Sequence, residues 1–269
     1  MRAISIEAFG DHESLQRRAL PTPTPGVGEI AIRVVNAGVS RSDLAAQCGA
    51  FSQLQAPWTP GFEVAGTVEA LGAEIADLRV GDRVYALARR GGGYAQTVVV
   101  PRTDVGRMPA SLLFEEAAAL GLDGAAAAIA LDGVDGAVHV RGAATGAGHL
   151  AVQLALAAGH EVSVDVGDDE GRRFVDRFGA IAHEPIAGAY RIDALDGSDG
   201  VNLSGDADSI QATLLRDGWP QGVEQTLATA IAQKRLLPRL FKILKIGQAS
   251  EAQNSLQSDA PCGKLVLSL

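Results

Sequence analysis

Hydrophobic and polar residues alternate in short runs over the first hundred residues of the chain. Five runs are rich in Val and Ile, and turn-forming Pro, Gly and Asp separate them: Ala3–Phe9, Glu29–Val35, Glu63–Leu71, Arg83–Ala86 and Tyr94–Val100. Alternation with a period of two is typical of strands that bury one face. Strands of this length and spacing favour a barrel-like β domain.

The pattern changes near Pro109, where runs with helical spacing begin. Ser111 can cap a helix that extends to Leu120, with Glu115 and Glu116 in its first turn. Two strand–helix pairs then follow: Ala137–Arg141 with Ala147–Ala158, and Glu161–Val166 with Asp168–Phe178. This order of strands and helices predicts a parallel sheet.

The remainder of the chain mixes both patterns. It predicts three strands, at Arg191–Leu195, Leu240–Ile246 and Lys264–Leu269. It also predicts three helices, at Ala207–Leu215, Val223–Lys234 and Ala249–Leu256. The predicted fold class is therefore α/β, with a β-rich, barrel-like part and a parallel-sheet part.

Composition narrows the range of partners. The 269 residues are 47% hydrophobic and 20% charged and carry a net charge of −9, so nucleic acid and anionic membrane are not expected to bind. Cys48 and Cys262 stand far apart in the sequence, and we expect them to form no disulfide framework or thiolate metal site.

The start of the chain lacks the features of a signal peptide. The most apolar stretch, Ala117–Leu131, is interrupted and too short to cross a bilayer. We therefore expect a cytoplasmic protein.

The clearest local motif is the glycine-rich segment Gly142–Gly148, which follows a predicted strand and opens a predicted helix. In this context Gly142, Gly146 and Gly148 allow a tight turn, and the first N–H groups of the helix can meet a pyrophosphate. Thr145 stands where such a turn prefers glycine. The alternative is a turn in which the glycines serve packing alone.

Asp165 lies seventeen residues after Gly148, at the end of the next predicted strand. An acid at that place accepts the adenosine ribose hydroxyls of NAD. The neighbouring Asp168, Asp169 and Glu170 would repel the additional phosphate of NADP. The alternative for this acidic run is the ordinary first turn of the next helix.

Several motifs, taken in order, resemble one family. They are Asn36–Asp43, Pro60–Gly66, Val80–Val84, Gly93–Ala95, Glu115–Leu120, Gly142–Gly148 and Gly263–Leu267. Together they resemble the medium-chain dehydrogenase/reductase superfamily, in its zinc-free quinone oxidoreductase branch. The resemblance implies a catalytic β domain of residues 1–110 and 236–269, a doubly wound, Rossmann-like domain of residues 111–235, and an active site between them.

The departures from the family pattern also carry information. Ser40 and Phe62 stand at the positions of zinc ligands in the zinc-dependent relatives, so no catalytic metal is expected. Ala45 replaces a tyrosine, Ala126 replaces a threonine near the nicotinamide, and Leu156 replaces a lysine that often faces the NADP phosphate. The region from Gly142 to Lys234 has room for roughly three βα units, which predicts a truncated cofactor domain with a deletion on its nicotinamide side.

The family's motifs also nominate site residues in the cleft. Ser40, Glu63 and Tyr94 are the predicted catalytic residues, and Arg41, Asp43, Phe51, Trp58 and Phe62 are predicted to bind substrate. If a cofactor is retained, Gly142, Thr145, Gly146, Gly148 and Asp165 are its predicted contacts. For the aromatic and charged residues, ordinary packing or ion pairing is the alternative.

Three functions remain open. The chain could be an NADH- or NADPH-dependent quinone, enone or enoyl reductase, a non-redox enzyme that cyclises or rearranges an unsaturated polyketide-like molecule, or a non-catalytic binding protein. Because a nicotinamide must be held at close range for hydride transfer, the deletion and the altered turn favour the second function. We therefore expect that no cofactor is required, that the substrate is an apolar unsaturated small molecule, and that a homodimer is possible.

Overall fold

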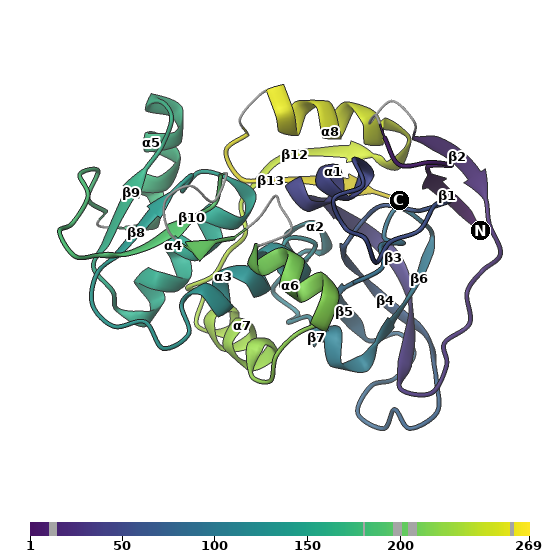
Figure 1. Cartoon of the computed structure of the whole chain (residues 1–269). Coiled ribbons are helices and arrows are strands. Elements are labelled where there is room, and N and C mark those ends of the chain that lie inside the picture. The colour runs from purple at the N-terminus through teal and green to yellow at the C-terminus, as the bar shows by residue number, and fades with distance from the viewer. Residues whose placement is uncertain (11–14, 180, 196–200, 204–208, 259–260) are drawn as a thin grey trace.

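The computed structural model describes residues 1–10, 15–179, 181–195, 201–203, 209–258 and 261–269. Two sheets dominate it, and they lie at opposite ends of the molecule in Figure 1. One sheet has seven strands and the other has four parallel strands, and helices fill the space between them. The predicted α/β fold class is confirmed. The domain bounds given above stay a prediction.

The seven-stranded sheet is built from both ends of the chain. Its strands are β3 (Glu29–Val39), β4 (Glu63–Leu71), β5 (Arg83–Leu87), β6 (Thr97–Pro101), β7 (Val105–Arg107), β12 (Leu240–Lys245) and β13 (Lys264–Ser268). The central strand β3 pairs antiparallel with β4 along one edge. Its other edge is shared by β6 on the first half and β13 on the second. The end of the chain therefore completes the sheet that the first hundred residues begin.

A separate hairpin-like pair lies at the start of the chain. Strand β1 (Arg2–Ser5) pairs antiparallel with β2 (Gln16–Ala19). The strand predicted at Ala3–Phe9 is thus shorter and begins earlier, and β2 was not predicted. The sequence of β2, Gln-Arg-Arg-Ala, has no apolar alternation, because three of its four residues are exposed and the fourth is half-buried.

The parallel sheet contains β8 (Val138–Arg141), β9 (Val162–Asp165), β10 (Tyr190–Asp193) and β11 (Val201–Asn202), in the order β11-β10-β8-β9. Helix α4 (Gly146–Ala158) connects β8 to β9, and α5 (Asp169–Val175) follows β9. The chain leaves β9 on one side of β8 and returns as β10 on the other. Such a reversal of strand order creates a crevice at the carboxyl ends of the strands.

The last crossover of this sheet is unusually short. Only residues 194–200 connect β10 to β11, although the two strands are parallel. A parallel connection usually needs a dozen or more residues, most often with a helix. The truncation of the cofactor domain stays a prediction.

The remaining helices differ in part from prediction. They are α1 (Arg41–Gln47), α2 (Phe114–Ala117), α3 (Ala125–Ala130), α6 (Ile210–Asp217), α7 (Val223–Ala232) and α8 (Ala249–Ser258), with short turns η2 (Arg102–Asp104), η4 (Asp176–Phe178) and η5 (Ile246–Gln248). Helix α1 was not predicted. Helix α6 begins at Ile210, and the predicted start at Ala207 lies outside the described residues.

The helix predicted over Ser111–Leu120 is instead interrupted. After α2, a π-helical turn, η3 (Leu120–Gly124), leads into α3. Gly121 lies directly against the carbonyl of Ala86, where any side chain would clash. Single π-helical turns are rare and are frequently found at functional sites.

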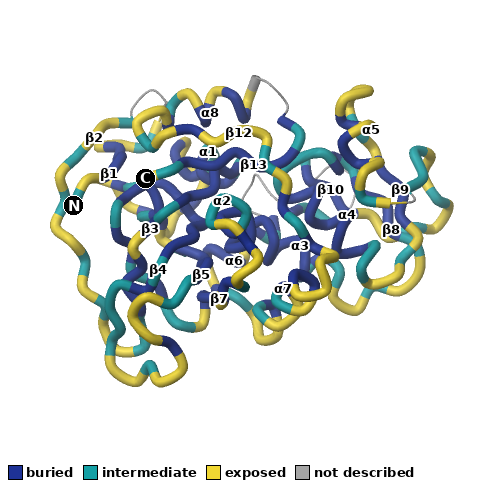
Figure 2. The backbone as a smooth tube through the Cα atoms, turned by 180° about the vertical axis from the view of Figure 1, so that it is seen from behind, coloured by how far each residue is buried: buried dark blue, intermediate teal, exposed yellow. Residues whose placement is uncertain are grey.

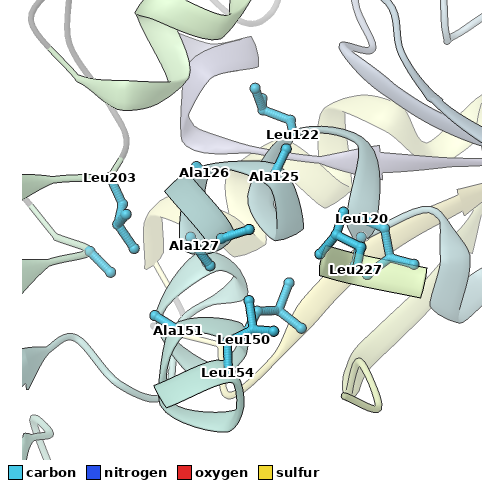
Figure 3. Close-up of a cluster of buried hydrophobic side chains, with 14 of the residues drawn as sticks. Leu120, Leu122, Ala125, Ala126, Ala127, Leu150, Ala151, Leu154, Leu203 and Leu227 are labelled. Carbon is cyan, nitrogen blue, oxygen red and sulfur yellow. The ribbon is translucent and has the colours of Figure 1, made fainter. Parts of the chain in front are cut away.

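Apolar side chains from several helices fill the space between the sheets. Figure 3 shows residues of η3 and α3 facing Leu150, Ala151 and Leu154 of α4, with Leu203 and Leu227 alongside. In Figure 2 the buried backbone runs through this centre, whereas exposed segments lie at the periphery. Alanine dominates α3 and lets it pack closely against α4 and α7.

We expect Leu150→Ala to lower the free energy of unfolding by about 2–5 kcal/mol, because it leaves a cavity in this core. Leu150 is fully buried, whereas Leu113 is 60% exposed. The matched variant Leu113→Ala should therefore change stability by less than about 0.5 kcal/mol. Urea denaturation measures both, and equal effects would contradict the packing described here.

Candidate functional site

A cleft of about 280 Å³ lies between the carboxyl ends of the parallel strands and the segments at the end of β3 and the start of β13. One wall is formed by residues at the carboxyl ends of β8, β9 and β10, and the other by residues 39–41 and 261–265. Ligands of open α/β sheets bind at the carboxyl ends of the strands, next to the reversal of strand order. The cleft has that position, so it is the main candidate for a ligand site.

The glycine-rich turn forms the floor of this cleft. Gly142 has a φ of +72°, which disfavours any other residue. A Cβ added at Gly146 would lie 2.6 Å from a carboxylate oxygen of Asp123, and one added at Gly148 would clash with the carbonyl of Gly142. The glycines therefore have a packing role, and Gly146 in particular keeps the cleft side of the turn free of side chain.

Thr145 is the N-cap of α4. Its hydroxyl accepts a hydrogen bond from the N–H of Gly148 at 3.1 Å and donates one to the carbonyl of Gly142 at 2.9 Å. The substitution for glycine thus stabilises the turn instead of blocking it. The N–H groups of Gly146 and Ala147, in the first helical turn, have no acceptor within the helix and border the cleft. The turn can therefore hold a pyrophosphate.

The acidic residue that faces the cleft at the end of β9 is Asp168, not the predicted Asp165. Asp165 is exposed, lies 4.0 Å from the guanidinium of Arg141, and does not line the cleft. Asp168 lines it and caps α5 by accepting the N–H of Gly171 at 2.7 Å. The sequence signal for Asp168 is its place just before Asp169 and Glu170, which is typical of the N-cap of a helix with an acidic first turn.

A buried ion cluster closes the inner end of the cleft. The ammonium of Lys264, on β13, lies 2.6 Å from a carboxylate oxygen of Asp123 and also contacts the carboxylate of Glu63. Lys264 is 1% exposed and Glu63 is fully buried. The other carboxylate oxygen of Glu63, which does not contact Lys264, accepts hydrogen bonds from the main-chain N–H groups of Leu122 and Asp123 at 3.0 and 3.3 Å. The cluster therefore connects β4, η3 and β13.

Two further polar side chains extend the cluster toward α1 and α6. Gln211 donates to the other oxygen of Asp123 at 2.6 Å, and the hydroxyl of Ser42 donates to Gln211 at 2.6 Å. All of these groups are buried. Because buried polar groups are costly unless they are paired, this chain of contacts fixes the geometry of the elements that carry it.

Burial raises the pKa of Glu63 to about 7, and the nearby charge of Asp123 adds to this, although Lys264 acts against it. Burial alone would lower the pKa of Lys264, but the carboxylates of Asp123 and Glu63 outweigh it and raise the pKa above its ordinary value. Lys264 is therefore a fixed cation beside the glycine-rich turn.

The predicted residues of the first motif are brought together around one capping box. Ser40 caps α1, and its main-chain N–H and its hydroxyl both donate to Asp43 at 2.9 Å. The other oxygen of Asp43 accepts the N–H of Gly61 at 2.9 Å. Ser40 and Arg41 line the cleft, whereas Asp43 is buried behind them. Burial raises the pKa of Asp43 above its ordinary value, although the hydrogen bonds from Ser40 and Gly61 lower it in part.

The predicted aromatic residues lie elsewhere. Phe51, Trp58 and Phe62 are buried together, with ring centroids 5.5 Å apart for Trp58 and Phe62 and 6.2 Å apart for Phe51 and Phe62. Tyr94 is fully buried, and burial, followed by the charges of Asp43 and Glu63, raises its pKa well above the ordinary value. These four residues and Glu63 do not line the cleft. Their surroundings favour structural roles.

His149 shows why a histidine beside the turn need not be catalytic. Burial lowers its pKa to about 4, so the ring is neutral near pH 7. Its Nδ1 contacts the carbonyl of Thr145 at 2.9 Å, and its Nε2 accepts the N–H of Arg239 at 2.9 Å. The ring therefore joins α4 to the segment that leads into β12.

Sequence reasoning missed Lys264, Asp123 and Gln211. Asp123 did carry a signal, because it is a charged residue inside the apolar stretch Ala117–Leu131. Lys264 belongs to the terminal motif Gly263–Leu267, whose pattern predicts a strand. Among the described residues, no cluster of three or more His, Cys, Asp or Glu could hold a metal ion. Within the same residues, no helix has the length and apolar character needed to cross a membrane.

Comparisons with known proteins identify a family match in the first part of the chain and similar folds over its whole length. Residues 26–110 match the alcohol dehydrogenase GroES-like domain. A mycobacterial protein solved with NADPH has a TM-score of 0.84 and 23% identity, covering all of both chains. A quinone oxidoreductase from Coxiella burnetii has a TM-score of 0.82 and 22% identity, covering 100% of this chain and 99% of that one. The fold is therefore that of a two-part dehydrogenase or reductase.

Curated relatives identify the family. The chain is 34% identical over 187 residues to the quinone oxidoreductase of Lama guanicoe, covering 67% of this chain and 57% of that protein. It is 30% identical over 213 residues to the human quinone oxidoreductase, covering 76% and 65%. The chain belongs to the medium-chain dehydrogenase/reductase superfamily, in its zinc-free quinone oxidoreductase branch. It spans little more than half the length of most of these relatives.

These relatives correct one prediction. The expectation that no nicotinamide cofactor is required is wrong, since the relatives are quinone oxidoreductases and similar solved structures include an NADPH complex and an NAD-dependent alcohol dehydrogenase. The predicted non-redox cyclisation finds no support among them. The physical reason for the error lies in Thr145, because its hydroxyl caps the turn and leaves the first helical N–H groups free.

The raised pKa of Glu63 predicts a pH dependence of stability. Because the folded value of about 7 exceeds the ordinary 4.5, the folded state takes up a proton between these values. The contribution of Glu63 is fully present below pH 4.5 and is lost as the pH rises through 7. Relative to Glu63→Gln, the native chain should lose on the order of 2–3 kcal/mol of unfolding free energy across this range.

Chemical denaturation at a series of pH values measures this difference. Comparison with Glu63→Gln cancels other titrations, including that of His149. The exposed control Glu161→Gln should follow the native profile. Parallel pH profiles for the native chain and Glu63→Gln would show that Glu63 keeps an ordinary pKa, contrary to the account above.

Proposed function

We propose that the chain is an NADH- or NADPH-dependent oxidoreductase that reduces a quinone or another conjugated carbonyl compound. The observation that carries the proposal is the glycine-rich turn at the carboxyl end of β8, which opens into a cleft completed by β13 and by the start of α1. The substrate class rests on the relatives, which are named quinone oxidoreductases.

The residues of the cleft fit the parts of a dinucleotide. The N–H groups of Gly146 and Ala147 suit the pyrophosphate, and the positive end of α4 adds to their attraction. Arg41 contributes a cation on the opposite wall. At the end of β9, Val166 and Gly167 border the space that the adenosine half would fill, next to the carboxylate of Asp168.

The bound cofactor would supply hydride, and the chain's own residues would provide position and charge. Lys264 keeps its proton and lies where it can stabilise negative charge near the turn. Val39, Leu256 and Leu265 give the cleft apolar surface that can exclude water from an apolar substrate. The hydroxyl proton of Ser40 is committed to Asp43, so Ser40 serves to position α1.

Turnover tests the proposal directly. Dialysed protein is incubated with a simple quinone, such as 1,4-benzoquinone or 9,10-phenanthrenequinone, with and without NADH or NADPH, and the product is analysed by mass. We expect conversion only with cofactor, accompanied by loss of absorbance at about 340 nm and gain of two hydrogens in the product. A product of unchanged mass formed without cofactor would overturn the proposal, and so would stoichiometric binding without turnover of any tested conjugated carbonyl.

We further expect NADH to bind more tightly than NADPH. The carboxylate of Asp168 borders the adenosine side of the cleft and would repel the 2′-phosphate of NADPH. Calorimetry should give an affinity for NADH that is about tenfold higher, equivalent to about 1.4 kcal/mol. Asp168→Asn should narrow this gap while retaining the cap of α5, because asparagine caps helices as well as aspartate does.

Asp169→Asn is the matched control, since Asp169 is exposed in the first turn of α5 and does not line the cleft. It should leave the NADH-to-NADPH ratio nearly unchanged. Tighter binding of NADPH by the native chain, or equal effects of the two variants, would refute the electrostatic explanation.

A further inference from the structure

A second concave surface lies away from the cofactor cleft and shares no lining residue with it. It has a volume of about 770 Å³ and is lined by residues of β1, β2, β3 and β12 and of the turn after β12. In Figures 1 and 2, β1 and β2 lie at the end of the molecule that carries the N-terminus, away from β8, β9 and β10. We call this surface the basic groove.

Five cationic side chains line the basic groove: Arg2, Arg17, Arg18, Arg33 and Lys245. Such a concentration contrasts with the net charge of −9 of the whole chain. Glu7 pairs with Arg18 at 2.7 Å, and Glu69 pairs with Arg33 at 3.0 Å. Within the described part of the chain, Arg2 and Arg17 form no ion pair. Lys245 likewise has no acidic partner among the described residues and donates to the hydroxyl of Ser268 at 3.1 Å. Three of the five groove cations therefore lack an acidic partner within the described part of the chain.

The two arginines are mounted on adjacent strands in a defined register. Arg2 pairs with Ala19 and Ile4 pairs with Arg17, so Arg2 and Arg17 are diagonal neighbours on one face of the β1–β2 pair. The guanidinium of Arg17 lies directly over Gly247, where a Cβ would displace it. Glycine at this position thus gives the guanidinium room to lie in the groove.

We propose that the basic groove binds a phosphorylated small molecule through its phosphate group, with Arg2 and Arg17 as the main contacts. Planar guanidinium groups bind phosphate through paired hydrogen bonds, and the pairing of β1 with β2 sets two of them side by side. The volume falls within the range of small-molecule sites. The proposal does not depend on the redox function, because the groove and the cofactor cleft have separate linings.

Calorimetry with inorganic pyrophosphate tests this site in the full chain, whose last residue, Leu269, also lies at the groove. Arg2→Gln/Arg17→Gln should weaken binding by about tenfold or more, since each charge-assisted hydrogen bond to phosphate is strong. The double variant should still bind NADH like the native chain, which also reports its folding. Arg216→Gln, an exposed change on α6 outside the groove, should leave pyrophosphate binding unchanged.

The same titration with Arg41→Gln distinguishes the two sites. If pyrophosphate affinity falls in Arg41→Gln and not in Arg2→Gln/Arg17→Gln, the anion occupies the cofactor cleft and the proposal is overturned. Absence of pyrophosphate binding to the native chain would overturn it as well. If the native chain binds pyrophosphate in the groove but does not oxidise NADH with a quinone, that result counts against the redox function and leaves the groove proposal intact.

Gly247→Ala provides an independent test that leaves both arginines in place. The added methyl group meets only the flexible end of Arg17, so the fold should persist while pyrophosphate binding weakens. Unchanged affinity in this variant would contradict the position assigned to the guanidinium. A hexaglutamate peptide is the competing ligand, and tighter binding of that peptide than of pyrophosphate would favour an acidic protein segment and overturn the assignment to phosphate.

Discussion

The arrangement of the molecule depends on one buried ammonium group. Lys264 brings a positive charge to a place that is almost closed to solvent, and two carboxylates, those of Asp123 and Glu63, surround it. Removing one partner of such a cluster typically costs about 3–5 kcal/mol, because the remaining charges stay buried without compensation. The cluster therefore tolerates little displacement of β4, η3 and β13, which carry its three members.

This constraint explains how a cleft persists beside a shortened parallel sheet. One carboxylate oxygen of Asp123 faces Gly146 and accepts from Lys264 at 2.6 Å, and its other oxygen accepts from Gln211 at 2.6 Å. The turn after β8 is thus held to the seven-stranded sheet through η3, and α6 is held to the same carboxylate. Trp219 adds a second attachment, because its indole N–H donates to the carbonyl of Gly121 at 2.9 Å.

Local patterns in the sequence predicted most strands, the glycine-rich turn and the family. They could not predict the ion cluster, because Lys264 and Asp123 are 141 residues apart and each is a single charge in an apolar context. The helix α1 was missed because its seven residues are stabilised by the Ser40–Asp43 capping box and not by an amphipathic pattern. Tyr94 and the Phe51–Trp58–Phe62 group were nominated from motifs alone, and burial separates them from the cleft.

The error about the cofactor has the same origin. The length of the region and the presence of Thr145 predict a damaged nucleotide site. The effect of Thr145, however, depends on two hydrogen bonds of its hydroxyl that exist only in the folded turn. The predicted deletion on the nicotinamide side stays a prediction, and residues at the carboxyl ends of β8, β9 and β10 line the cleft.

The NADH affinity of Lys264→Met tests most directly whether the Lys264 cluster shapes and charges the cleft at the carboxyl ends of β8, β9 and β10. Methionine retains much of the side-chain volume but leaves Asp123 and Glu63 without a cation next to the pyrophosphate position. Calorimetry on folded protein should then give NADH binding at least about tenfold weaker than in the native chain, a difference of about 1.4 kcal/mol or more. An unchanged NADH affinity in a folded Lys264→Met variant would contradict the account.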